Sequence, residues 1–396
     1  MRVGNIKTMK VLINAVSAKL GGAATYARNL ARSLVEQAAA QEEFLFIVPE
    51  ERAAEMPSGD ARVRVRASGA ASGSYAARWW WEQVTLRGLT RYERPDVLFS
   101  SANFAMLACP CPQVLLVRIP IYFSRKYLEH VMPEKSATFR AEIALRRWLV
   151  ARSVSAADFV MTPTAAMRDD LARFVKLDAN RAVVNAYGVP RERVNAAKPR
   201  GASGKLRILW VSHYADHKNL ATLLRAAEIL RAEMDFELVL TLDAALRNGQ
   251  HTPMPAAERE LLARLAGVAR LTGVRSYEET WALYREADVF VFPSLCESFG
   301  HPLVEAMASG LPIVASDIPV HREICGNAAA YFPVRDAAAL AETLRGLMHD
   351  AAERQQLALR GSERVKKFLW EDHVQRLLEL WRRMAGKRLR VEGLKS

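Results

Sequence analysis

Two glutamates with seven residues between them stand in a stretch whose other residues favour a strand, a turn and a short helix. Glu297 follows an apolar run at residues 289–292, which is typical of a strand buried on both faces. Glu305 follows Pro302, which favours the first turn of a helix, and Gly310 suits the left-handed end of that helix. The pattern therefore predicts one carboxylate on the turn and the other on the helix.

The residues between the two glutamates predict a binding turn for an extended ligand. In a parallel α/β sheet, ligands bind outside the carboxyl ends of the strands, where this turn would lie. The amide groups of a helix amino terminus attract anions, and Gly300 lets the backbone come close to a ligand. Glu297 and Glu305 could then hold different parts of one molecule. The simpler interpretation, two solvated charges, suits a lone glutamate better than it suits this whole pattern.

A second polar turn is predicted at residues 213–219, between a strand at residues 206–212 and a helix that begins near Leu220. Lys218 could meet a phosphate there, because a cation at a strand end lies where anionic ligands bind; the alternative is a solvated surface lysine. His213 opens the same turn, and imidazole is only partly protonated near neutral pH. The turn is therefore a candidate cationic site.

In the first half of the chain, Gly21 and Gly22 follow a strand predicted at residues 10–15 and begin a helix. Such a turn can bind a phosphate or an acceptor substrate, although two glycines can also form a simple tight turn. Arg118 ends another strand, predicted at residues 114–118.

The composition limits the class of protein and its partners. The chain has 396 residues and a formal net charge of +13, which favours anionic partners such as nucleotides or an anionic membrane surface. Its four cysteines form no Cys-x-x-Cys pair, so we expect reduced thiols. No apolar segment is long enough to span a membrane, and the amino terminus does not resemble a signal peptide. We expect a cytoplasmic protein, with peripheral binding to the inner face of the plasma membrane left open.

Two segments bear on membrane binding. Residues 122–152 alternate basic and apolar side chains, which indicates either an ordinary solvent-exposed surface or a face that meets an anionic leaflet. Three consecutive tryptophans at residues 79–81 could lie at a membrane interface, but we expect them to pack in a protein core.

Alternating strands and helices predict an α/β protein, and the length predicts two domains. Residues 67–73 are predicted to form a flexible connection, and residues 198–205, rich in glycine, proline and charge, a linker. We expect a first domain over residues 1–200, a second domain over residues 205–375, and a C-terminal helix with a basic tail over residues 376–396.

The string that starts at Glu297, Glu-Ser-Phe-Gly-x-Pro-Leu-Val-Glu-Ala-Met-Ala-Ser-Gly-Leu-Pro-Ile-Val, resembles the donor site of the retaining GT-B glycosyltransferases of family 4. The resemblance implies two facing Rossmann-like, doubly wound domains, with the last helix crossing back to the first domain. It also implies that Glu297 touches the transferred sugar and that Glu305 holds the ribose of the nucleotide. The residues between them would bind sugar hydroxyls and diphosphate, largely through the backbone: Ser298, Phe299, Gly300, Leu303 and Val304.

The same resemblance implies roles for the other turns. Lys218 and His213 would neutralise the donor diphosphate, with His213 at a position where the family has an arginine. Asn219 would add a donor contact, and Val274 would lie in a turn beside the nucleobase. Three residues would lie at the leaving phosphate and the acceptor: Gly21, Gly22 and Arg118.

The resemblance implies a retaining hexosyltransferase that uses a nucleotide-diphosphate sugar, with mannose as one candidate sugar. The acceptor would be a glycan or a lipid-linked molecule in the synthesis of a cell-surface polysaccharide such as lipopolysaccharide. Because no Asp-x-Asp occurs, we expect no metal and no further cofactor. The alternatives are a nucleotide-sugar epimerase of the same fold or a non-catalytic module that binds membranes or glycans. No sequence motif indicates nucleic-acid binding or a dinucleotide dehydrogenase.

Overall fold

The computed structural model describes residues 9–19, 22–69, 74–194, 205–242 and 254–393. Gly21 and most of the linker predicted at residues 198–205 lie outside the described residues. The chain divides into two compact α/β units. The first comprises Met1–Phe123, Ser136–Ala186 and Trp370–Ser396, and the second comprises Ser124–Lys135 and Tyr187–Leu369.

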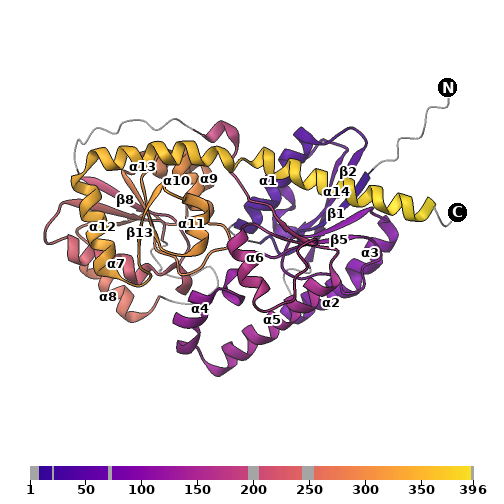
Figure 1. Ribbon diagram of the computed structural model, residues 1–396, viewed down its shortest axis with the longest axis horizontal. Helices are drawn as coiled ribbons and strands as arrows, with labels where there is room; N and C mark the ends of the chain where they lie inside the picture. The colour runs from indigo at the N-terminus through magenta and orange to yellow at the C-terminus, as the bar shows by residue number, and fades with distance from the viewer. Residues whose placement is uncertain (1–8, 20–21, 70–73, 195–204, 243–253, 394–396) are drawn as a thin grey trace. The chain divides into compact units, whose positions relative to one another are not determined.

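A sheet of seven parallel strands forms the centre of the first unit, in the order β3-β2-β1-β4-β5-β6-β7 (Figure 1). The strands are β1 (Met9–Asn14), β2 (Glu42–Pro49), β3 (Val63–Ser68), β4 (Val97–Ser100), β5 (Gln113–Leu116), β6 (Phe159–Thr162) and β7 (Ala182–Val184). Every residue of β4 and β5 is buried, as expected for central strands with both faces covered. The sequence analysis did not predict β3: its arginines point outward from an edge strand, so it lacks the apolar run of the inner strands.

Helices cover this first sheet. They are α1 (Gly22–Gln37), η1 (Glu50–Glu55), α2 (Tyr75–Gln83), α3 (Thr85–Glu93), η3 (Pro120–Tyr122), α5 (Ala137–Ala156), α6 (Ala165–Ala172) and α14 (Trp370–Gly393). The last of them, α14, packs on α1, β1 and β4, with the Trp381 ring against Phe44 and Phe99 (Figure 1). The C-terminal helix therefore completes the first unit, which confirms the expected crossover.

The second unit has a sheet of six parallel strands in the order β10-β9-β8-β11-β12-β13. The strands are β8 (Leu206–Trp210), β9 (Phe236–Leu240), β10 (Ala269–Leu271), β11 (Val289–Phe292), β12 (Ile313–Ser316) and β13 (Ala329–Phe332). The helices are α4 (Arg125–His130), η4 (Met132–Glu134), η5 (Arg191–Arg193), η6 (Asp216–Lys218), α7 (Leu220–Leu230), α8 (Ala256–Arg264), α9 (Tyr277–Glu286), α10 (His301–Ala308), α11 (Pro319–Cys325), α12 (Ala337–His349), α13 (Ala351–Arg364) and η7 (Val365–Lys367).

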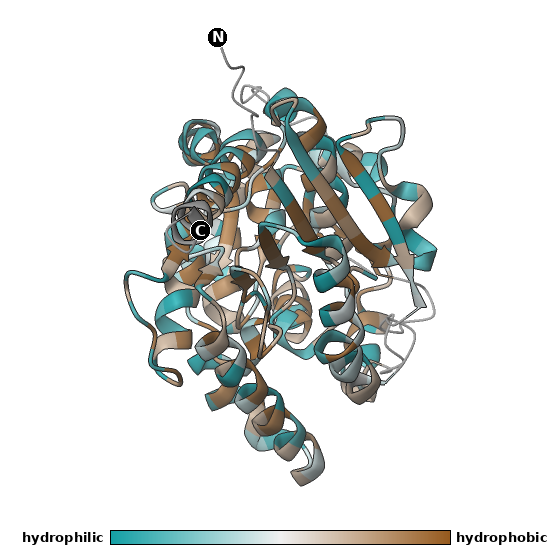
Figure 2. Ribbon diagram, turned by 90° about the vertical axis from the view of Figure 1, so that its right-hand side faces the viewer, coloured by the Kyte–Doolittle hydropathy of each residue, from teal (hydrophilic) through white to brown (hydrophobic). Residues whose placement is uncertain are grey.

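The hydropathy of the elements follows this layered arrangement. Figure 2 shows strands that are mostly brown, with helices that carry teal residues along their length. Such helices bury one apolar stripe against a sheet and keep their polar face in water. None of the helices in the described part of the chain combines the length and the hydropathy that crossing a membrane requires.

The three consecutive tryptophans of α2 do not share one environment. Trp79 packs edge-on against Phe104, and Trp81 packs against a core cluster of the first sheet. Trp80 is 67% exposed, so the expectation of core packing is wrong for this residue. Helix periodicity is the reason, because three successive residues of a helix cannot all point to the same side.

Candidate functional site

The two polar turns of the second unit lie side by side at the carboxyl ends of β8 and β11. These strands pair directly in the sheet, so the turns that follow them are neighbours. The Asn219 side chain donates a hydrogen bond to the carbonyl of Pro293 at 3.0 Å. The amide of Leu295 donates to the carbonyl of His217 at 2.7 Å. The fold thus brings together residues that are about eighty positions apart in the chain, as the strand order of a doubly wound sheet requires.

An ion pair joins the two turns: Lys218 Nζ lies 2.6 Å from Glu297 Oε1. Lys218 is only 9% exposed, so it is not a solvated surface lysine. Its ammonium group also lies 5.5 Å from the centre of the Phe292 ring. Burial would raise the pKa of Glu297, but the positive charge and hydrogen bond of Lys218, together with the neighbouring His217 and His321, outweigh burial and hold this pKa below its ordinary value. Glu297 is therefore ionised at neutral pH.

Two histidines that the sequence analysis did not single out stand around this ion pair. Burial lowers the pKa of His217 to about 3 and the pKa of His321 to about 4, so both rings are neutral at physiological pH. His321 lies on α11, and its Nδ1 is 2.9 Å from the carbonyl oxygen of Ser316 at the end of β12. His217 sits beside Lys218 in the sequence and could have been noted there; nothing local marks His321.

His213 stands at the start of the same turn, where the charges of Lys218 and Glu297 both act on it. Among the described residues, no hydrogen bond joins it to Lys218 or Glu297, and its side chain is exposed. Partial desolvation, helped by the positive charge of Lys218, lowers the pKa of His213 below its ordinary value. In the ligand-free protein this imidazole is therefore mostly uncharged at neutral pH.

Helix α10 begins where the backbone turns sharply at Gly300. Its φ of 87° lies in the left-handed region, and a Cβ there would come within 3.0 Å of the Leu303 side chain. The side chains of Phe299, Leu303 and Val304 are buried in the protein. A ligand at this helix terminus would therefore meet backbone groups rather than these side chains, although the Leu303 amide already donates to the carbonyl of Gly300 at 2.9 Å. Ser298 lies partly exposed beside them.

Glu305 lies in the second turn of α10, and its surroundings differ from those of Glu297. The Tyr284 hydroxyl of α9 donates a hydrogen bond to Glu305 Oε2 at 3.0 Å. No ion pair to Glu305 occurs within the described ranges. Burial raises the pKa of Glu305 to about 7, only partly opposed by the hydrogen bond from Tyr284. Tyr284 was not predicted as a site residue.

The other candidate donor contact, Val274, follows β10 at the far side of the same sheet edge. Gly273 precedes it with a φ of 78°, and Val274 is 85% exposed. An apolar side chain held out into solvent at a strand end is available for contact with a planar ligand. The side chain of Asn219 is already engaged, since it joins the two turns and accepts a hydrogen bond from Thr222.

The predicted acceptor residues belong to the first unit. Gly22 is the exposed first residue of α1. Arg118 follows β5, and its guanidinium carbon lies 5.6 Å from the centre of the Tyr26 ring. The Asn103 side chain accepts hydrogen bonds from the amides of Arg118 and Ile119, which fixes the backbone after the strand.

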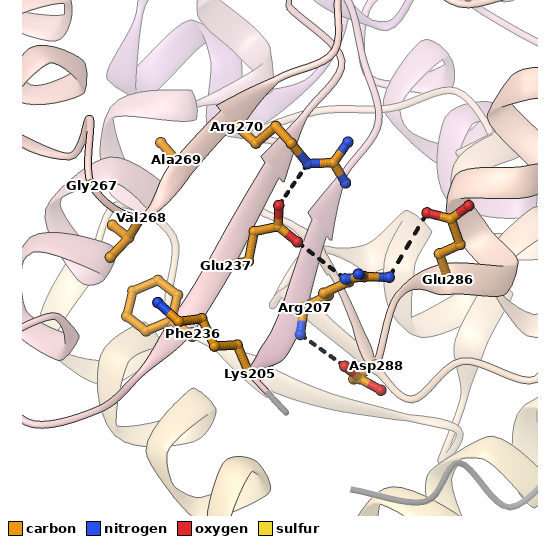
Figure 3. Close-up of a pocket in the computed structure, with 10 residues that line it drawn as sticks. All are labelled: Lys205, Arg207, Phe236, Glu237, Gly267, Val268, Ala269, Arg270, Glu286 and Asp288. Atoms are coloured by element: carbon orange, nitrogen blue, oxygen red, sulfur yellow. Dashed lines mark hydrogen bonds and ion pairs between the residues drawn. The ribbon is translucent and has the colours of Figure 1, made fainter. Parts of the chain in front are cut away.

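A hollow of about 550 Å³ lies at the opposite, amino-terminal edge of the second sheet (Figure 3). Its charged side chains neutralise one another: Arg207 and Arg270 both pair with Glu237, at 3.1 Å and 2.6 Å. We therefore assign no ligand to it. Throughout the described ranges, no three His, Cys, Asp or Glu side chains gather in a way that could hold a metal ion.

Comparison with known proteins gives matches over most of the chain. The family model "Glycosyl transferases group 1" matches residues 192–364, and "Glycosyl transferase 4-like domain" matches residues 21–188. A phosphatidyl-myo-inositol mannosyltransferase of Mycolicibacterium smegmatis is 32% identical over 190 residues, 47% of this chain and 47% of that protein. An alpha-maltose-1-phosphate synthase of the same species is 25% identical over 292 residues, 69% of this chain and 75% of that one.

The fold also matches a solved structure over nearly its whole length. The sucrose-phosphate synthase of Thermosynechococcus elongatus superposes with a TM-score of 0.76 at 17% sequence identity, covering 96% of this chain and 100% of that one. At this identity the match establishes the fold, and the ligands of the site have to be argued from its own residues.

Proposed function

This chain belongs to the family 4 (group 1) retaining glycosyltransferases of GT-B fold, and we propose that it transfers a hexose from a nucleotide-diphosphate sugar to a glycan or a lipid-linked acceptor. The observation that carries the proposal is the buried Lys218–Glu297 ion pair beside the amino terminus of α10. These groups supply a cation, a carboxylate and the amino terminus of a helix within one turn region. That set suits a sugar joined to a diphosphate better than it suits either part alone.

In the proposed reaction, Lys218 and the amino terminus of α10 stabilise the diphosphate as its bond to the sugar breaks. Negative charge develops on the leaving phosphate oxygen, where a fixed cation and helix amides act most strongly. Glu297 stays ionised and faces the sugar, whose anomeric carbon becomes positively charged in the transition state. The acceptor hydroxyl oxygen bonds to the anomeric carbon on the face that the phosphate leaves, which retains the anomeric configuration, and the departing phosphate takes the proton of that hydroxyl. His213 adds a second cation when it is protonated.

We propose Glu305 as the carboxylate that binds the ribose hydroxyls, with Val274 at the nucleobase and the backbone of Ser298 and Gly300 at the sugar and diphosphate. In this proposal the second domain, residues 205–375, binds the donor, and the first, residues 1–200, binds the acceptor through Gly22 and Arg118. The helix and tail at residues 376–396 complete the first domain.

The choice of mannose and of a lipid acceptor is supported by the phosphatidyl-myo-inositol mannosyltransferase relative. The alpha-maltose-1-phosphate synthase relative supports a different hexose and a soluble acceptor. The test is a screen of UDP-, GDP- and ADP-linked glucose and mannose for nucleotide release, first without acceptor and then with phosphatidylinositol, glucose 1-phosphate and isoprenoid-linked sugars. A retained anomeric signal in the product supports the proposal, and a chain that turns over no nucleotide sugar in any combination contradicts it.

The same screen separates transfer from epimerisation. An epimerase of this fold would change the sugar in the absence of any acceptor, whereas a transferase releases nucleotide and joins the sugar to the acceptor. Chromatography of the sugar product without acceptor therefore decides between the two functions. An epimerised free sugar would replace the present proposal.

We further propose that α5 meets an anionic membrane surface. Leu145 and Trp148 are each 57% exposed, and Arg152 lies on the same face of the helix. Arg140 and Arg152 form no ion pair among the described residues, whereas Arg147 turns inward and donates to the carbonyl of Tyr122. An exposed tryptophan flanked by free arginines suits the headgroup region of a membrane.

Vesicle flotation at low and high salt tests this surface. We expect recovery with anionic vesicles, a decline as salt screens the arginines, and a further loss in Leu145→Ser/Trp148→Ser. The matched control is Trp80→Ser, which removes an exposed tryptophan from α2. Equal recovery with neutral and anionic vesicles would contradict the membrane proposal.

A further inference from the structure

The Tyr284 side chain reaches from α9 to the carboxylate of Glu305 on α10, with 3.0 Å between its hydroxyl and Oε2. Its ring is fully buried between two others, 6.0 Å from the centre of Trp281 and 5.5 Å from that of Phe290. These contacts leave the phenol little freedom to rotate. The hydroxyl is therefore a fixed donor rather than an adaptable surface group.

We propose that Tyr284 is a positioning residue of the donor site, whose hydroxyl holds the Glu305 carboxylate in the orientation that accepts the two ribose hydroxyls of the nucleotide. This inference rests on the proposed function, in which Glu305 binds ribose. A carboxylate offers about four acceptor positions, and one bond to Oε2 leaves enough for two further donors. A rigid partner reduces the entropy lost when those donors bind.

Within the described part of the chain, no other titratable group bonds to Glu305. Of the groups on the elements packed against α10, only Tyr284 affects Glu305. Several of the polar groups on these elements have partners of their own: Glu279 (Ser276), His321 (Ser316), Arg322 (Asp317), Arg364 (the carbonyl of Ile324) and Lys366 (Glu363). The strands β11 and β12 present only apolar and small side chains. Among the described residues, Tyr284 is therefore the side chain that holds Glu305 in place, and its hydroxyl moderates the effect of burial on the pKa of Glu305.

Nucleotide affinity should depend on pH, because no cation pairs with Glu305 among the described residues. Burial raises the pKa of Glu305 to about 7, and the Tyr284 hydroxyl opposes the rise because it favours the charged form. Two ribose hydroxyls would favour the charged form further, so nucleotide binding should release a proton. Affinity is then full above the pKa of the free carboxyl and falls as the pH drops through it. Without the Tyr284 hydroxyl, that pKa rises and the loss begins at higher pH.

The experiment is calorimetric titration with UDP and with GDP from pH 6 to pH 9, on the parent, Tyr284→Phe, Glu305→Gln and the double variant. We expect Tyr284→Phe to bind about fivefold more weakly at pH 7, because a rise of about one pH unit from a pKa near 7 lowers the charged fraction of Glu305 from about one half to about one tenth. At pH 9 the variant should bind nearly as well as the parent. In the Glu305→Gln background the second substitution should cost nothing, because Tyr284 acts through the carboxylate. Tyr331→Phe is the matched control, because its hydroxyl donates to the carbonyl of Gly326 and not to Glu305.

The outcomes are distinguishable. An unchanged pH midpoint in Tyr284→Phe, or the same loss in the Glu305→Gln background, would reduce Tyr284 to a packing residue and overturn the inference. A parent that binds neither nucleotide at any pH would instead remove the proposed function, and this inference with it. The same midpoint shift in Tyr331→Phe would also count against it, because the shift would then not depend on the hydroxyl that contacts Glu305.

Discussion

The loop after β11 and the second turn of α10 each hold one carboxylate of the same short unit, and their surroundings differ in charge. Glu297 pairs with Lys218 at 2.6 Å, and its pKa lies below the ordinary range. Glu305 has a phenol for a partner, and its pKa is raised to about 7. Similar burial thus leads to opposite protonation behaviour, because only one of the two carboxylates is given a cation.

This difference suits the two proposed tasks. A carboxylate beside a sugar that becomes positively charged has to remain ionised throughout the reaction, and a buried cation ensures that. A carboxylate that binds hydroxyl groups needs acceptor positions, and a permanent cation would occupy some of them. The free protein therefore stabilises the charge of Glu297, where the chemistry is proposed. It leaves acceptor positions of Glu305 unoccupied by a cation, so that ribose hydroxyls can bind there.

The largest effect is expected from breaking the ion pair with Lys218→Met. Turnover should fall by about a hundredfold or more, the scale seen when one preorganised group facing developing negative charge is lost. Folding stability should fall by about 3–5 kcal/mol, because Glu297 is left as an unpaired charge in a poorly solvated site. Steady-state kinetics and urea unfolding measure the two losses.

The control for this variant is Lys205→Met, which removes a lysine from the exposed ion pair with Asp235. A surface pair contributes about 0–1 kcal/mol, so both quantities should stay near those of the parent. If Lys218→Met turned over nucleotide sugar within threefold of the parent, Lys218 would have no part in the reaction.

The next effect concerns how folding stability changes with pH. The contributions of the two glutamates should change in opposite directions. The raised pKa of Glu305 means that its contribution is present below the unfolded value of 4.5 and lost as the pH rises through about 7. Glu305→Gln should therefore be more stable than the parent at pH 8, by up to about 3 kcal/mol, with the gain shrinking toward pH 5.

Glu297 has a lowered pKa, so its contribution is present above the unfolded value and lost as the pH falls. Glu297→Gln should be less stable than the parent at pH 8, and the deficit should narrow as the solution becomes acidic. Urea unfolding of both variants at several pH values checks the pair. If both substitutions changed the free energy of unfolding at pH 8 in the same direction, the protein would not stabilise the two carboxylate charges differently.

The shared turn could be predicted from the sequence to a large extent. Pro302 and Gly310 mark the ends of α10 because each has a strong local backbone preference, and Gly310 indeed has a φ of 67°. The alternation of strands and helices likewise predicted both sheets. Local preferences do not report long-range pairing, however. The meeting of Lys218 with Glu297 depends on β8 and β11 being neighbours in the sheet.

The partners of the two carboxylates could not be predicted for the same reason. Tyr284 looks like an ordinary apolar position of α9, and only the packing of α9 on α10 turns its hydroxyl toward Glu305. His321 is five residues from Ser316, yet its burial under the turn depends on β12 and α11. The edge strand β3 was missed because its outward arginines obscure the alternation of apolar residues.

A smaller effect on both carboxylates together is expected from Gly300→Ala. An alanine in the left-handed region costs about 1–2 kcal/mol, and its Cβ would also press on Leu303. Nucleotide affinity and turnover should fall together, because the turn carries Glu297 and leads into α10.

Gly346→Ala is the control: it lies inside α12 with open space around it, so it should stabilise the protein by about 0.5–1 kcal/mol. A loss of turnover without loss of affinity in Gly300→Ala would mean that the two sites are not coupled through this turn.

The smallest effect is expected from His213, which adds charge to the Glu297 side only when it is protonated. In the free protein its pKa lies below the ordinary value, so the imidazole is uncharged at pH 8, and His213→Gln should bind UDP or GDP within about twofold of the parent there. A bound diphosphate favours the charged ring and raises that pKa, so parent affinity should gain from this residue as the pH falls toward 6. The deficit of His213→Gln should then grow to several-fold, while Glu305 acts in the opposite direction and weakens both proteins equally. His213→Arg carries a permanent charge, so its nucleotide affinity should not fall further behind that of the parent as the pH drops. A ratio of parent to His213→Gln affinity that stays constant from pH 6 to pH 8 would leave Lys218 as the only side-chain cation that acts on the diphosphate in this turn.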